Sequence, residues 1–111
     1  MRLVIFVTLL ALSNSVSAVS IKDWPRAKGS EPFLVHINGV GQGLSWANAW
    51  LAGEGHPKIY CEPKKVLTAQ DYLMILEREM NNKEFLAGLP SETPLEGILL
   101  QGLINNFPCK K

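Results

Sequence analysis

The first eighteen residues do most to limit what this chain can fold into, because we expect them to be removed. Met1-Arg2 gives a positively charged start, and the apolar run Leu3–Leu12 has only Thr8 as a polar interruption. That run is much shorter than the roughly twenty residues that a membrane-spanning helix needs. It is followed by Val16-Ser17-Ala18, whose first and last residues suit the −3 and −1 positions of a signal peptidase site. We therefore predict a signal peptide at residues 1–18, with a buried N-terminal core helix as the alternative.

Cleavage after Ala18 would leave a periplasmic or secreted protein of balanced charge. Removing 18 residues from 111 leaves 93. Arg2 is among those removed, so ten basic and ten acidic residues remain. Nucleic acids and anionic membranes are bound through clustered Lys and Arg, so we expect neither as a partner. A chain of this size forms one domain with a modest core, which a covalent link would help to stabilise.

The chain has only two cysteines, Cys61 and Cys109. In an oxidising compartment we expect them to pair, with free reactive thiols as the alternative. The disulfide would close a loop of about 49 residues, worth roughly 4 kcal/mol by the chain-entropy argument. It would also remove both thiols from the set of possible nucleophiles.

The apolar spacing predicts helices throughout the rest of the chain. Residues 19–30 contain Pro25 and Gly29 and suggest an extended or loosely docked arm, ahead of a helical domain at 31–111. A first helix follows from Glu31 and stops at Gly53 and Gly55, and in it Gly39 and Gly43 share one flank, where another element could approach closely. Its apolar stripe consists of Phe33, Ile37, Val40, Leu44, Ala47 and Leu51.

Two further helices have start signals of their own. Thr68 and Asp71 form a variant of the capping box before a helix that runs to about Asn81. Thr93 as N-cap, with Glu96 three residues later, predicts the last helix, which Pro108 stops. One turn at Lys83–Leu86 would be a fourth helix. No strand alternation of useful length occurs, so we predict an all-α bundle of three to four helices tied by one disulfide.

No group of residues indicates catalysis. His36 and His56 lack neighbours at metal-ligand spacing, and the serines lack the context of a nucleophile elbow. The acidic residues around the second helix, Glu77, Glu79 and Glu84, suit a solvated face better than a catalytic carboxylate pair. We therefore expect a non-enzyme with no cofactor and no metal.

Two features suggest binding. Trp46 and Trp50 lie one turn apart beside the apolar stripe, in line with Gly39 and Gly43. Either they belong to a wide buried arc, or they anchor a partner or a second copy of the chain in a homodimer. The other feature is the segment Asn82–Thr93, which carries apolar residues in a connection that contains Gly and Pro. These residues either pack back onto the bundle or present an apolar tip to a groove in a partner. The candidate contact residues are Asn82, Lys83, Phe85, Leu86, Leu89, Ser91 and Glu92.

The motifs together resemble one known family. The glycine-bearing run Ile37–Leu44, the stretch Tyr60-Cys61-Glu62-Pro63 before Val66–Gln70, and the closing Phe107-Pro108-Cys109 resemble the Rap/Tai family. These are the resistance-associated and type VI amidase immunity proteins of Gram-negative bacteria, and the resemblance covers about Phe33 to Cys109. It implies a periplasmic helical protein that blocks a peptidoglycan amidase delivered by type VI secretion, by inserting an inter-helix loop into the active-site groove of the toxin. It also implies a disulfide between Cys61 and Cys109, and the segment Asn82–Thr93 corresponds best to the inserted loop.

The expected function is therefore that of an immunity or inhibitor protein whose partner is a peptidoglycan amidase effector. The alternative is a small periplasmic acid-stress chaperone, or another non-catalytic envelope protein, because full protonation of ten carboxylates would leave a large positive charge on a small fold.

Overall fold

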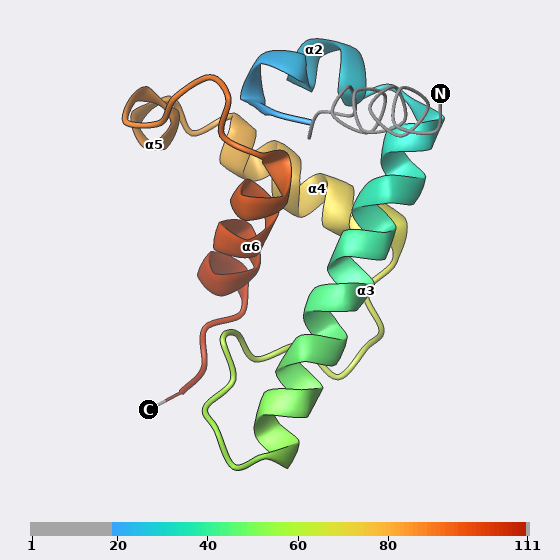
Figure 1. Ribbon diagram of the computed structural model, residues 1–111, viewed down its shortest axis with the longest axis vertical. Coiled ribbons are helices and arrows are strands. Elements are labelled where there is room, and N and C mark those ends of the chain that lie inside the picture. The colour runs from blue at the N-terminus through green and yellow to red at the C-terminus, as the bar shows by residue number, and fades with distance from the viewer. Residues whose placement is uncertain (1–18, 111) are drawn as a thin grey trace, which may run out of the picture.

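The computed structural model describes residues 19–110, and the predicted signal peptide lies outside them. In this part the chain is mostly helical, with no strand beyond one isolated bridge between Ser20 and Pro94 (Figure 1). None of the described helices is both long and apolar enough to cross a membrane. The elements are a 3-10 helix η1 (Ile21–Asp23) and the α-helices α2 (Trp24–Ala27), α3 (Glu31–Gly53), α4 (Ala69–Met80), α5 (Lys83–Ala87) and α6 (Leu95–Asn106). The predicted all-α fold is confirmed.

The predicted arm at residues 19–30 is not extended but forms η1 and α2 and packs against the start of α3. The carboxylate of Asp23 accepts from the Ser20 backbone N–H at 2.9 Å and from the Ser20 hydroxyl at 3.1 Å, which starts η1. The ring of Trp24 meets Phe33 edge to face with centroids 6.2 Å apart, and both Ser20 and Ala27 are buried. The arm is therefore held by local hydrogen bonds and by its contact with α3, and its backbone also bonds to residues 91–95.

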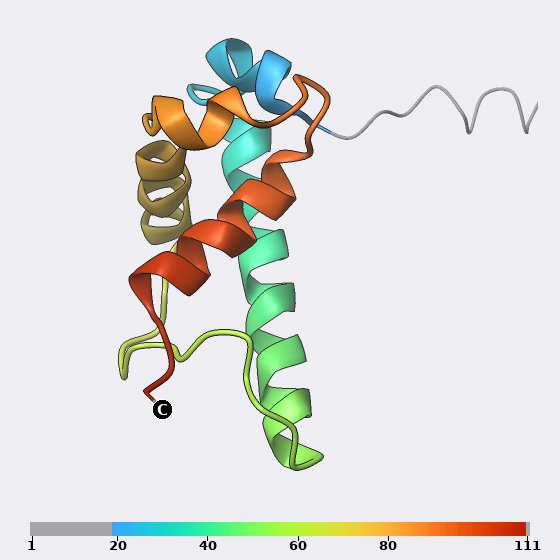
Figure 2. The same cartoon turned by 90° about the vertical axis from the view of Figure 1, so that its left-hand side faces the viewer.

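Helix α3 is the longest element, and it begins and ends where the sequence predicts. Its N-cap is Ser30, whose side chain accepts from the Phe33 N–H at 3.2 Å, and Gly55 beyond its end adopts a positive φ of 77°. Figures 1 and 2 show the C-terminal half of α3 extending past the ends of α4 and α6, where the connection of residues 54–67 and the tail that follows α6 lie. One end of this helix is therefore in the core and the other is largely exposed.

The core forms where α4 and α6 pack together and α3 crosses them. The capping box of α4 is as predicted: Thr68 Oγ1 accepts from the Asp71 N–H at 3.2 Å, and Asp71 Oδ2 accepts from the Thr68 N–H at 2.8 Å. At Gly102 of α6 an added Cβ would lie 2.7 Å from Ile75 Cγ2, so the glycine permits the close contact between α4 and α6. The most buried apolar side chains are Ile37, Tyr60, Tyr72, Leu76, Leu95, Ile98, Leu99 and Leu103.

The glycine of α3 that permits a close approach is Gly41, not Gly39 or Gly43. Gly41 is buried, and a Cβ placed there would overlap the ring of Tyr72 in α4. At Gly39 and Gly43 an added Cβ would meet nothing within 4 Å. The predicted packing reason for these two glycines is therefore wrong within the monomer, because both lie on the exposed side of the helix.

The predicted disulfide between Cys61 and Cys109 is present, with Cα atoms 4.9 Å apart. The Cys61 N–H also donates to the Phe107 carbonyl at 2.7 Å. The disulfide therefore fastens the connection after α3 to the tail that follows α6.

The start of α6 differs from the predicted capping box. The helix begins at Leu95 with Pro94 as its N-cap, and the Thr93 hydroxyl donates to the Pro90 carbonyl at 2.7 Å instead of capping. The Leu95 N–H donates at 2.9 Å to the carbonyl of Val19, so backbone from the N-terminal arm takes the place of the side-chain cap.

Candidate functional site

The segment Asn82–Thr93 forms a corner of the molecule built around the short helix α5. Asn82 caps this helix by accepting from the Phe85 N–H at 3.2 Å. The predicted turn at Lys83–Leu86 is thus present, with one further residue. Figures 1 and 2 place α5 at the same end of the molecule as α2, beyond the end of α4 and opposite the connection of residues 54–67. We call residues 82–93 the corner segment.

Backbone hydrogen bonds fix the corner segment at both of its ends. At its start, the Asn82 N–H donates to the Glu79 carbonyl of α4 at 3.1 Å. At its end, the Ile21 N–H donates to the Thr93 carbonyl at 3.0 Å and the Lys22 N–H to the Ser91 carbonyl at 3.1 Å. The N-terminal arm therefore acts as a clamp on the far end of the segment, which no sequence motif indicated.

The seven predicted contact residues fall into two groups. The side chains of Phe85, Leu86 and Leu89 are partly buried and pack against the core. Of the two packing alternatives, the structure shows the one in which these apolar residues return to the bundle. The exposed members are polar: Asn82, Lys83, Ser91 and Glu92. These exposed side chains are polar and carry both signs of charge, and the apolar side chains of the segment lie beneath them, against the core.

The carboxylate of Glu92 belongs to this surface and stays ionised to lower pH than usual. A hydrogen bond from Ser91 lowers the pKa of Glu92, and the positive charge of Lys22 adds to the effect. The corner segment thus exposes the anions Glu84 and Glu92 and the cation Lys83.

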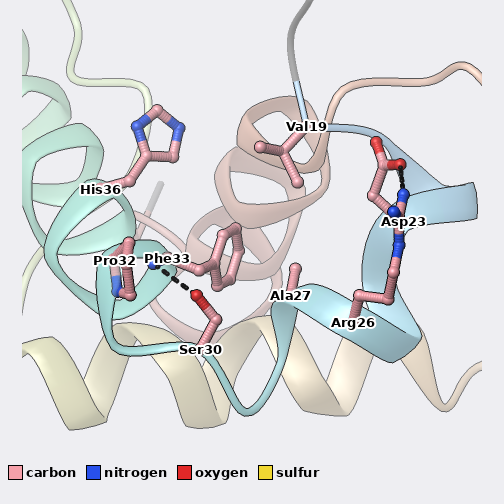
Figure 3. A pocket seen from close by; sticks show the side chains of 8 residues that line it. All are labelled: Val19, Asp23, Arg26, Ala27, Ser30, Pro32, Phe33 and His36. Carbon is pink, nitrogen blue, oxygen red and sulfur yellow. Dashed lines mark hydrogen bonds and ion pairs between the residues drawn. The ribbon is translucent and has the colours of Figure 1, made fainter.

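A cleft of about 460 Å³ lies next to the clamp, between the N-terminal arm and the start of α3 (Figure 3). Its walls include Val19, Arg26, Phe33 and His36. The Arg26 guanidinium pairs with Asp23 at 2.9 Å, so the two charges at one side of the cleft balance each other. The cleft is open to solvent and is lined by both polar and apolar side chains. No motif in the sequence predicted it.

Trp46 and Trp50 are exposed, with 75% and 64% of their surface accessible. Of the two alternatives drawn from the sequence, burial in a wide core arc is therefore wrong. The buried side of α3 also differs from the predicted apolar stripe. Ala47, a member of that stripe, is exposed, whereas Asn48 is only 1% exposed.

The histidines lie apart, and His36 has a structural partner. His36 Nε2 lies 2.7 Å from Glu96 Oε1, which ties α3 to the first turn of α6, while His56 is exposed in the connection after α3. Among residues 19–110 no three His, Cys, Asp or Glu side chains gather where they could hold a metal ion.

Two buried tyrosines lie close together under α3. Burial raises the pKa of both Tyr60 and Tyr72, and the negative charge of Glu62 raises it further. The Tyr60 hydroxyl is buried and has no hydrogen-bond partner within the described part of the chain. Both phenols therefore stay protonated over the physiological pH range and serve as packing groups.

In comparisons with protein-family models, curated proteins and solved structures, no family model, protein or structure matched this chain.

Proposed function

We propose that this chain is an immunity or inhibitor protein that binds a peptidoglycan amidase of the type VI secretion class and occludes its groove with the corner segment. The observation that carries the proposal is that residues 82–93 project at one corner while both of their ends are held by backbone hydrogen bonds. A segment held in this way loses little conformational freedom on binding, which favours affinity. The resemblance of the cysteine and proline motifs to the Rap/Tai family supplies the class of partner.

The contact would be made by the polar outer surface of the segment, since its apolar residues already pack on the core. Lys83 and Glu92 are exposed near its two ends and offer one charge of each sign. Polar groups at an interface fix orientation and specificity more than they set raw affinity. In this proposal, Phe85, Leu86 and Leu89 hold the segment in shape for its partner.

The test is titration calorimetry of the disulfide-intact protein against purified type VI peptidoglycan amidases, with amidase activity measured in parallel. The proposal expects one-to-one binding and loss of activity with at least one of these enzymes. The informative variant is Lys83→Glu/Glu92→Arg, because both side chains are exposed and we expect the reversal of their charges to leave the fold intact. Phe85→Asp is less suitable, since a half-buried side chain that packs on the core affects folding as well as binding.

A matched control is available at the opposite end of the molecule. Lys58→Glu/Glu54→Arg makes the same two charge changes at exposed positions in the connection of residues 54–67. We expect the variant in the corner segment to weaken binding at least tenfold and the control to bind like the unaltered protein. Equal binding by both variants would contradict the assigned segment, and absence of binding to every amidase would contradict the partner class.

The acid-stress chaperone remains the second candidate because the described surface exposes several large apolar side chains. They are Val35, Trp46, Trp50, Ile59, Val66 and Met74. At about pH 3, where carboxylates are largely protonated, a chaperone should suppress the aggregation of an unrelated unfolded protein. A dedicated inhibitor should not do so, and the same assay at neutral pH serves as its control.

A further inference from the structure

A groove of about 270 Å³ lies between the middle of α3 and the connection of residues 54–67, and none of its lining residues belongs to the corner segment. Each wall supplies one large exposed apolar side chain: Trp46 of the helix and Val66 of the connection have 75% and 81% of their surfaces accessible. Polar or charged side chains line the groove as well, namely Gln42, Ser45, Glu62, Lys64 and Lys65. Exposed apolar side chains that gather beside polar ones in a groove mark a binding site, whereas single ones scattered over a surface do not.

Hydrogen bonds join the two walls of this groove and fix its shape. The Ser45 hydroxyl of α3 donates to Glu62 Oε2 of the connection at 3.1 Å. The Nε2 atom of Gln42, one turn earlier on the helix, donates to the Leu67 carbonyl at 3.3 Å. The disulfide at Cys61 holds the connection immediately before Glu62. A ligand would therefore meet a preformed surface, which reduces the ordering cost of binding.

We propose that this groove binds a pyranose ring of a glycan, with one face of the sugar against the indole of Trp46. The C–H groups on one face of a pyranose are weakly positive and the face of an indole carries negative charge density, so the two attract each other. The hydroxyl groups of a sugar both donate and accept hydrogen bonds. The groove offers an acceptor in the Glu62 carboxylate and a donor in the Lys64 ammonium.

Other kinds of ligand use less of this groove than a sugar does. An apolar peptide side chain would cover Trp46 and Val66 but would leave Glu62 and Lys64 desolvated without partners, which is costly. Phosphate or another simple anion would pair with Lys64 but would lie near the like charge of Glu62, and it would not use the indole. A sugar ring uses both the aromatic surface and the polar groups around it, which is the usual composition of a small-molecule site.

The lysines of the groove favour a glycan that carries an acidic group. Lys65 Nζ lies 3.6 Å from Asp71 Oδ1 and is already paired, whereas Lys64 is exposed and forms no ion pair within residues 19–110. A carboxylate attached to the bound sugar would pair with Lys64. Bacterial cell-wall glycan, whose sugars carry acidic peptides, has this chemistry, and neutral chains of N-acetylhexosamine share only its rings.

Nuclear magnetic resonance of the disulfide-intact protein tests the proposal. The chain has three tryptophans, and of these only Trp46 lines the groove, so its indole N–H signal reports the site while the signals of Trp24 and Trp50 serve as internal controls. The probe is the neutral tetramer of N-acetylglucosamine, added to about 10 mM because one sugar ring should bind with a Kd on the order of 1 mM. We expect the Trp46 signal to move and the other two to stay in place.

A matched pair of variants on the same helix locates the contact. Trp46→Ala should raise the Kd, read from the backbone N–H signal of Val66, by about tenfold. Trp50→Ala removes an equally large side chain that is 64% exposed but lies outside the groove, and it should bind like the unaltered protein. Circular dichroism should show unchanged helical content in both variants. The proposal is overturned if the sugar moves no Trp46 signal, if it moves that of Trp50 equally, or if Trp46→Ala binds as well as the unaltered protein.

A parallel titration with a soluble disaccharide–peptide fragment of peptidoglycan identifies the source of the glycan. Tighter binding of this acidic fragment, lost in Lys64→Gln, would assign the groove to cell-wall glycan. Equal affinity for the two probes would assign it to N-acetylated glycans in general, and both results support a pyranose site. Amidase binding is a separate measurement at the corner segment, so either proposal can fail without the other.

Discussion

The side-chain amide of Asn48, in the projecting half of α3, forms two hydrogen bonds to the backbone beside Tyr60. Its Nδ2 donates to the Tyr60 carbonyl at 2.7 Å, and its Oδ1 accepts from the Ile59 N–H at 2.8 Å. Asn48 is 1% exposed, so water does not compete for these bonds. One buried amide thus fixes the connection that leads into the disulfide.

Replacing Asn48 with Ala should destabilise the protein by about 2–4 kcal/mol, because a buried carbonyl and a buried N–H would each lose a partner. Urea unfolding followed by circular dichroism measures this directly. Asn81→Ala, at an exposed position, should change stability by less than about 0.5 kcal/mol. A similar small loss for both variants would mean that the disulfide and the other hydrogen bonds hold the connection without Asn48.

Gly41→Ala should cost about 1–3 kcal/mol, because a methyl group would press on the ring of Tyr72 between α3 and α4. Gly97→Ala, at a helical position with open space, should instead be neutral or stabilise by up to about 1 kcal/mol. Thermal unfolding of the two variants separates steric cost from helix propensity. A stabilised Gly41→Ala protein would show that α3 and α4 can move apart freely.

Reduction of the disulfide, or Cys61→Ser/Cys109→Ser, should lower the free energy of unfolding by about 2–4 kcal/mol, since the closed loop is long. The measurement is urea unfolding with and without reductant. The double serine variant should give the same midpoint in both conditions. If the reductant lowers the midpoint of this variant too, its effect does not come from the disulfide.

The cap of α4 should make stability depend on pH in the acid range. Hydrogen bonds from the backbone and hydroxyl of Thr68 lower the pKa of Asp71, and Lys65 at 3.6 Å adds a weaker effect. Because the folded pKa lies below the unfolded one, the cap stabilises fully above the usual carboxyl pKa of about 4 and loses its effect as pH falls through the lower folded value. Asp71→Asn keeps an acceptor oxygen but has no charge. Its urea midpoint should therefore lie below that of the unaltered protein at pH 7, and the difference should shrink at about pH 2.

Much of the fold could be predicted from the sequence because the strongest signals are local. The Thr68–Asp71 box, the glycine stop after α3 and the turn at residues 83–86 depend only on neighbouring residues, and each is present. The disulfide could be predicted because no other cysteine competes for either partner.

The remaining features depend on contacts between distant residues. Thr93 has the sequence of a cap, yet the backbone at Val19 replaces it. Glu79 was expected on a solvated face but is 5% exposed, and its carboxylate accepts from Asn105 Nδ2 at 3.2 Å. The role of Gly41 likewise depends on where the ring of Tyr72 lies. In the corner segment, the sequence suggested candidate contact residues but did not show which of their side chains face outward.

Two long-range contacts in this chain close loops that overlap in sequence, and neither loop lies within the other. The hydrogen bond from Leu95 to Val19 closes one loop, and the disulfide between Cys61 and Cys109 closes the second. In a polypeptide that emerges N-terminus first, the Val19 carbonyl has no partner until the start of α6 is free. Such non-local contacts make folding slow and place it after the chain is complete. We therefore expect the described part of the chain to reach its final shape only once α6 and the tail that follows it are available for both closures.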